Sequence, residues 1–350
     1  MKGRRGPGAP PRPGGGRGQR RASRGGAALA GLRAAARPAW AEPMTVKLVS
    51  QSDSLFKGHK RVVIPAYHVN FITSQQATAV ATIGVRTRLA LALFGVEEAT
   101  MRRLADEAYA DLRAQFADAG IEVVSEADAK ALVTTAGLAL APGNLIRGGG
   151  GGGVTVGKSI RRGFVTVGAA QAPALTAYKL PEQIGGFGNS MAIAGQLGAG
   201  KGMQKPAWDL DANVIIPSLT LDFAQMEAST GQGMLGARAN AGGVVQFMIR
   251  TDSPVTTLNP ASGGRFSTPG GLRPDKDVVS RTSFATVEEG GAPVRIGSMT
   301  TTVDENYQTV ARARGDAVIV NLPVWESLVR DAYRGYNAAI VAAVAKVVKR

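Results

Sequence analysis

The chain contains two early stretches whose polar and apolar positions favour β-strands. From Val62 to Ile72 the residues are mostly β-branched or aromatic, so we expect a strand with Pro65 at its start or at a sheet edge. From Arg86 to Leu93, Arg and Ala side chains alternate with Thr and Leu, which is the period of a half-buried strand. The folded part of the chain is therefore predicted to begin with two strands.

A helix is predicted directly after them. Glu97 and Glu98 favour a helix N-terminus, and Gly120 is typical of the residue that follows a helix C-terminus. Between them, apolar residues recur at three- and four-residue intervals, at Met101, Leu104, Ala108, Leu112 and Phe116. We expect Leu104, Leu112 and Phe116 to be buried against a sheet.

A short strand and a second helix are predicted next. Ile121 to Val124 is β-rich, and Ser125 with Asp128 resembles a capping box that opens a helix reaching about Val133. Beyond it, residues 142–202 are rich in Gly and small residues, and the apolar positions around Gly157 and Phe164 favour a hairpin.

The rest of the chain predicts more strands and two helices. Strands are expected at Val214 to Phe223, Val244 to Arg250, Val278 to Val287 and Val294 to Val303. One helix is expected to open at Asp304 and Glu305, and another near Pro323 with Trp325 and Leu328 on its apolar face. The predicted class is α/β, with a mixed, largely antiparallel sheet and long helices packed on it, in a single domain over residues 42–350 with a Gly-rich insertion at 142–202.

Composition and charge narrow the possible chemistry. The 350 residues include no Cys and only His59 and His68, which excludes thiolate catalysis, disulfides and His-rich or Cys-rich metal sites. The net charge is +15, but residues 1–41 carry ten basic and no acidic side chains, whereas residues 42–350 carry 31 basic and 26 acidic ones. The basic character therefore belongs mainly to the N-terminal segment.

Residues 1–41 are predicted to be a disordered basic leader with the features of a signal peptide. Arg20, Arg21 and Arg24 precede an apolar stretch, Gly25 to Ala36, and Ala39-Trp40-Ala41 has the small residues of a cleavage site before Glu42. An organellar transit peptide and a plain basic tail that contacts nucleic acid are the alternatives. No run of about 20 apolar residues occurs, so no membrane-spanning helix is expected.

One segment has the spacing of a phosphate-binding loop. Gly152, Gly157, Lys158 and Ser159 satisfy that pattern, in which backbone amides and a Lys contact phosphates. A phosphate-binding loop needs a helix after it, whereas a β-like stretch follows here. We therefore interpret the segment as a hairpin tip and expect no cofactor, and a nucleotide-dependent enzyme that uses this segment remains the alternative.

Four other positions carry residue types that can take part in catalysis or metal binding, Ser190, Asp209, Asp211 and His68. Ser190 lies in a sequence close to a nucleophile elbow, but no His follows it, so we interpret it as a loop residue. Asp209 and Asp211 could bind a hard cation, although a solvated turn is the favoured reading. His68 is expected to be a hydrogen-bonded structural residue.

The body resembles the periplasmic α/β domains of the curli secretion channel type. The resemblance rests on the strand from Val62 to Ile72, the helical segment from Ala99 to Tyr109, the residues after that helix from Gly120 to Val124, and the strand from Asn213 to Phe223. It implies an exported protein of a bacterial envelope. We expect a non-enzymatic role in binding or assembly, with a protein partner or self-assembly, and no nucleic-acid contact once the leader is removed.

Overall fold

The computed structural model describes residues 44–50, 56, 58–82, 85–150, 157–177, 187–233, 236–260, 271–297 and 309–348. The predicted leader, residues 1–41, and Gly152 lie outside these ranges. Four α-helices are described, α1 (Glu98–Asp118), α2 (Glu126–Thr135), α3 (Phe187–Asp209) and α4 (Leu322–Val348), with a short 3-10 helix at Pro142–Asn144.

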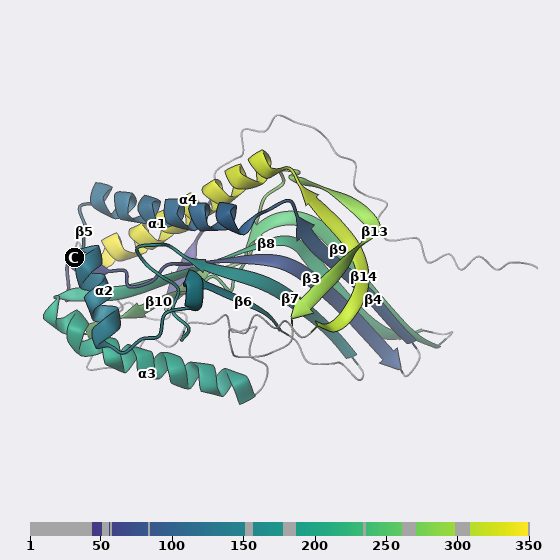
Figure 1. Ribbon diagram of the computed structural model, residues 1–350, viewed down its shortest axis with the longest axis horizontal. Coiled ribbons are helices and arrows are strands. Elements are labelled where there is room, and N and C mark those ends of the chain that lie inside the picture. The colour runs from purple at the N-terminus through teal and green to yellow at the C-terminus, as the bar shows by residue number, and fades with distance from the viewer. Residues whose placement is uncertain are drawn as a thin grey trace, which may run out of the picture. The chain divides into compact units, whose positions relative to one another are not determined.

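The described strands form one connected sheet (Figure 1). They are β1 (Leu48–Ser50), β2 (Arg61–Val63), β3 (His68–Thr82), β4 (Val85–Phe94), β5 (Glu122–Val123), β6 (Leu145–Gly150), β7 (Gly157–Gly168), β8 (Ala212–Gly233), β9 (Gly236–Ile249), β10 (Val255–Leu258), β11 (Leu272–Pro274), β12 (Val278–Val279), β13 (Ala285–Gly297) and β14 (Thr309–Val320). Most pairs are antiparallel, and β2–β5, β2–β8, β3–β8 and β4–β14 are parallel. The predicted mixed sheet with helices packed on it is confirmed.

Strand β3 changes its neighbour part-way along. One edge pairs with β7 almost throughout, whereas the other edge pairs with β8 at His68–Phe71 and with β4 from Ser74 onward. Strand β8 leaves β3 after Leu221 and continues as a hairpin with β9. Register shifts, which bend strands, occur in both strands near this point, which we call the fork.

Beyond the fork, the β8–β9 hairpin packs on one face of the β3–β4 hairpin. The Thr87 hydroxyl donates to the carbonyl of Ala239 at 2.7 Å, and a Cβ added to Gly243 would lie 2.6 Å from Met226 Sδ and 3.6 Å from a methyl group of Leu89. Because Gly243 has no side chain, β9 can approach Met226 and Leu89 this closely. The face that carries Thr87 and Leu89 is covered, and Arg86 and Arg88 lie on the opposite face because side chains alternate along a strand.

The helices cover the other end of the sheet (Figure 1). Helices α1 and α4 share a core with Tyr67, Phe71 and Leu219, whereas α2 and α3 pack on the opposite face, against Val63 and Val214. At the surface, Arg103 and Arg330 each contact both Glu107 of α1 and Glu326 of α4, which ties the two helices together. No helix in the described ranges is long and apolar enough to cross a membrane.

Several local predictions are confirmed. Helix α1 ends before Gly120, which has a φ of 69°, and Leu104, Leu112 and Phe116 are fully buried. The Ser125 side chain accepts a hydrogen bond from the Asp128 amide at 3.1 Å and so caps α2. Strand β4 and helix α4 also lie where alternation and helical periodicity predicted them.

Four predictions need correction. Pro65 separates two strands, β2 and β3, because its ring cannot donate to a ladder. The strands expected within 278–303 are instead β12 and one long β13 that runs through Gly290 and Gly291. Asp304 and Glu305 lie outside the described residues, and Thr309–Val320, where a helix from them would continue, is strand β14. The Gly-rich insertion contains helix α3, which was not predicted.

Candidate functional site: a basic face on strands β3, β4 and β7

The strand register brings polar residues from three strands to one face of the sheet. Thr78 in β3 lies opposite both Arg88 in β4 and Ser159 in β7. One rung nearer the fork, Gln76 lies opposite Arg161 of β7, and one rung further out, Val80 lies opposite Arg86 of β4. Directly opposed residues project from the same face, so these side chains share one surface, which we call the basic face.

Three guanidinium groups on this face lie near one another. Burial lowers the pKa of Arg88, and the charges of Arg86 and Arg161 lower it further. Arg86 and Arg88 are exposed and make no ion pair with any described residue, and Arg161 is half-buried. An anion placed beside Arg86 and Arg88 would be attracted by both charges.

The basic face also carries buried polar side chains, and one of them has no hydrogen-bond partner among the described residues. Thr78 and Gln76 are buried, at 5% and 3% exposed. The group without a partner is the buried hydroxyl of Ser159.

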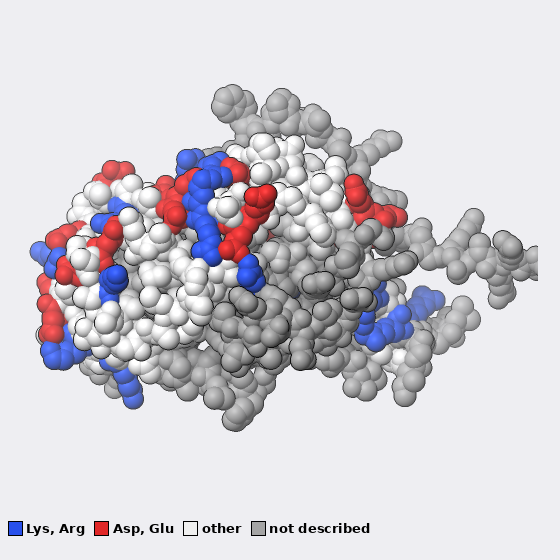
Figure 2. Space-filling model, viewed as in Figure 1, with Lys and Arg blue, Asp and Glu red and all other residues white. Residues whose placement is uncertain are grey.

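Figure 2 shows where this charge gathers on the visible side of the molecule. Lys and Arg side chains cluster near the ends of the long hairpins on the right of the view, with no acidic described side chain among them. Over the helical end, by contrast, basic and acidic side chains lie next to one another. A separate group of acidic side chains lies above this cluster on the right of the view.

The predicted phosphate-binding segment is arranged differently from a phosphate-binding loop. Gly157, Lys158 and Ser159 begin strand β7, which pairs with both β3 and β6, and no helix follows them directly. Lys158 lies opposite Ala79, whereas Ser159 lies opposite Thr78, so the two side chains project from opposite faces. The Lys and the hydroxyl cannot converge on one phosphate, and Ser159 belongs to the basic face instead.

We therefore expect Lys158→Ala to change neither the stability of the protein nor its affinity for ATP or GTP. Lys158 is exposed and makes no ion pair with a described residue, so its removal breaks no contact. Titration with labelled nucleotides in the presence of magnesium measures the affinity. Micromolar binding that disappears in the variant would instead establish a nucleotide site.

The other residues considered in the sequence lie apart from the basic face. Ser190 lies in the first turn of α3, not in a loop as expected. Asp209 pairs with Lys205 at 2.7 Å, and Asp211 accepts from His59 Nδ1 at 2.6 Å, so the two carboxylates have different partners. They do not form a shared cation site.

His68 is a structural residue, as predicted. Its Nε2 accepts a hydrogen bond from the Leu175 amide at 3.1 Å, so the proton lies on Nδ1 and is donated to the Ser218 hydroxyl at 3.0 Å. Burial lowers the pKa of this imidazole to about 4. The ring therefore stays neutral and joins β3 to β8.

A buried carboxylate that the sequence did not reveal lies at the fork. Asp222 Oδ1 accepts from Gln75 Nε2 at 2.5 Å and from the Phe223 amide at 2.8 Å. Its Oδ2 lies 3.5 Å from Arg162 Nε and 3.9 Å from Arg250 Nε. Burial raises the pKa of Asp222 to about 6, although both arginines oppose the rise.

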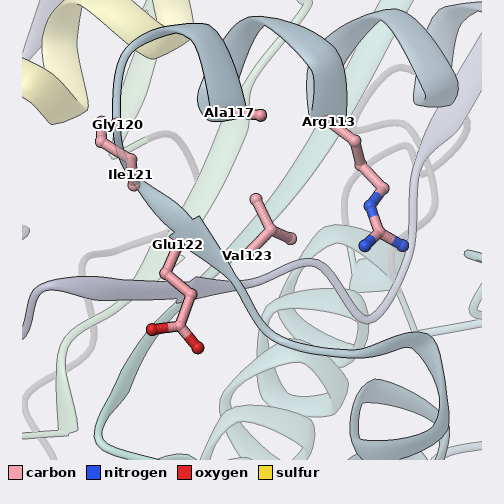
Figure 3. Close-up of a pocket in the computed structure, with 6 residues that line it drawn as sticks. All are labelled: Arg113, Ala117, Gly120, Ile121, Glu122 and Val123. Carbon is pink, nitrogen blue, oxygen red and sulfur yellow. The ribbon is translucent and has the colours of Figure 1, made fainter.

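A surface pocket of about 400 Å³ lies between the end of α1 and β5 (Figure 3). Its charged wall residues already have partners, because Arg113 donates to Glu126 at 2.5 Å and Glu122 pairs with Arg61 at 2.8 Å. The remaining lining is Ala117, Gly120, Ile121 and Val123. The pocket is therefore less well equipped for a charged ligand than the basic face.

Comparisons of the chain with protein-family models, with curated proteins and with solved structures each found no match.

Proposed function

We propose that this protein is exported to a bacterial cell envelope, where it acts without catalysis by binding an acidic partner protein on the basic face. The observation that carries the proposal is that Arg86 and Arg88 are exposed on one face of β4 and make no ion pair with any described residue. Guanidinium groups bind carboxylates through paired, charge-assisted hydrogen bonds. A partner with exposed Asp or Glu would pair with Arg86 and Arg88.

The residues best suited to acid–base catalysis are engaged in contacts that hold the fold. Both ring nitrogens of His68 are hydrogen-bonded, His59 is held by Asp211, and Asp222 lies between two arginines. A general base must be within reach of a substrate proton, and these groups are occupied by the protein itself. This supports a binding role rather than an enzymatic one.

Export rests on the leader and on the resemblance to periplasmic α/β domains. If residues 1–41 are removed by a signal peptidase, the mature chain begins at Glu42, because Ala39 and Ala41 supply the small residues that the enzyme requires. Mass spectrometry of the N-terminus in fractionated cells measures this. Recovery of a cytosolic chain that still carries Lys2 and the basic leader would contradict it.

The basic face is tested by protection of its arginines. We expect poly-glutamate to protect Arg86 and Arg88 of the full-length chain from phenylglyoxal, and the Arg86→Ala/Arg88→Ala variant to bind it about tenfold more weakly. Mass spectrometry of the modified peptides reports each arginine separately, so the protection of Arg86 and Arg88 is read independently of any binding to residues 1–41.

A charge-matched control is the Lys158→Ala/Lys201→Ala variant, which removes the same charge from exposed positions outside the basic face. It should bind as the unaltered protein does. Equal weakening in both double variants, or no protection of Arg86 and Arg88, would contradict the proposed site.

A further inference from the structure

The two oxygens of the Asp222 carboxylate at the fork have different surroundings. Oδ1 accepts hydrogen bonds from Gln75 Nε2 and from the Phe223 amide. Oδ2 is completely buried and has no hydrogen-bond partner among the described residues. Arg162 Nε lies 3.5 Å from it and Arg250 Nε lies 3.9 Å from it, and both distances exceed the range of about 2.7–3.2 Å for an N–H···O hydrogen bond.

Two more buried atoms beside Asp222 have no hydrogen-bond partner among the described residues. One is Gln75 Oε1, because this amide makes its hydrogen bonds through Nε2, to Asp222 Oδ1 at 2.5 Å and to the carbonyl of Ala224 at 2.6 Å. The other is Arg250 Nε, although Nη1 of the same guanidinium group pairs with Asp277 at 3.0 Å. Together with Asp222 Oδ2, these atoms are two acceptors and one N–H donor.

We infer that the fork binds an ordered water molecule, held between Asp222 Oδ2 and Arg250 Nε. A water about 2.8 Å from each atom would span the 3.9 Å that separates them, accepting from the N–H and donating to the carboxylate. Its second hydrogen can be donated to Gln75 Oε1, on the side chain that already contacts the same carboxylate. Buried waters typically make about three hydrogen bonds to groups that otherwise lack partners, and this set of atoms provides that number.

The charges around the site favour a water over an ion. An anion beside Arg250 would lie against the carboxylate of Asp222, and a metal cation beside Asp222 would be repelled by the guanidinium groups of Arg162 and Arg250. A water has no net charge and both donates and accepts, so it suits a donor that lies next to an acceptor. Because Asp222 lies in β8 and Arg250 directly follows β9, the water joins the two strands of the hairpin where β8 leaves β3.

Crystallography of the full-length protein, at a resolution that shows ordered water, tests this inference. We expect a density peak within about 3.2 Å of both Asp222 Oδ2 and Arg250 Nε, unchanged in crystals soaked in bromide. A direct hydrogen bond between these two atoms, with no peak beside them, would overturn the inference. Bromide at the position of the peak would overturn it as well, because the site would then bind an anion.

Magnetic relaxation dispersion of water tests the site in solution, because it counts long-lived internal waters. Arg250→Met removes the donor but keeps a long side chain, and it should lower the count by about one. Arg273→Met, at an exposed arginine of β11, is the control and should leave the count unchanged. An unchanged count in a folded Arg250→Met variant would overturn the inference, and if that variant does not fold, the crystal structure of the unaltered protein decides. Neither measurement involves Arg86 or Arg88, so the result is independent of the proposed function.

Discussion

Replacing Asp222 with alanine is expected to lower the free energy of unfolding by about 3–5 kcal/mol. The change leaves Arg162 and Arg250, which are 13% and 16% exposed, without the carboxylate between them, and removes the acceptor used by Gln75 and by the Phe223 amide. Denaturant unfolding measures the loss. Glu227→Ala is the matched control, because Glu227 lies on the same strand, is exposed and makes no ion pair with a described residue.

The milder change Asp222→Asn should show that the protonation of Asp222 and that of His68 have opposite effects on stability in acid. The pKa of Asp222 rises from 3.8 to about 6, so the folded state takes up a proton before the unfolded chain does, and stability is gained as pH falls through 6. The pKa of His68 falls from 6.5 to about 4, so the unfolded chain takes up the proton first, and stability is lost over nearly the same interval. Each shift corresponds to roughly 3 kcal/mol.

In the protein these two contributions oppose each other between pH 6.5 and 4. Asp222→Asn removes the gain and leaves the loss, so the variant should lose up to about 3 kcal/mol more than the unaltered protein when the pH is lowered across that range. Unfolding curves at several pH values measure the difference. Parallel pH profiles for the two proteins would show that Asp222 does not titrate in this interval.

Leu112→Ala is the second change expected to have a large effect, a loss of about 2–5 kcal/mol. Leu112 is completely buried in the core that α1 shares with the sheet and α4, and α1 is tied to α4 at the surface, so the helices cannot easily close over the cavity. Thermal or denaturant unfolding measures the loss.

Leu140→Ala removes the same atoms from a side chain that is 48% exposed and should cost far less. If the two leucine variants were equally stable, the buried face of α1 would have been misassigned.

Local signals in the sequence were sufficient for α1, the start of α2 and α4. The spacing of Leu104, Leu112 and Phe116, the Gly120 stop and the Ser125 cap are all short-range features, and the structure confirms each of them. Helix α3 was missed because its first half is Gly-rich and lacks an apolar stripe of helical period. Strand β13 was divided because Gly290 and Gly291 resemble a turn.

The candidate site could be predicted only in part. Alternation already put Arg86 and Arg88 on one face of a strand, but Arg161 joins them only through the register of β7 on β3, which pairs residues far apart in the chain. Asp222 lies within a β-rich run of the sequence that does not single it out. Its partners, Arg162 and Arg250, come from two other segments of the chain. No local pattern specifies such long-range pairings.

The fork has a consequence for how the chain acquires its structure. The contact between His68 and Ser218, next to the fork, joins residues 150 positions apart, and Tyr67 reaches Asn337 across 270 positions. Chains dominated by such distant pairings fold slowly, because the entropy of closing long loops is lost before the contacts compensate for it. The centre of the sheet therefore cannot be completed until β8 has been synthesised, and its helical cover cannot be completed until α4 has been. A growing chain remains without its finished core for most of its length.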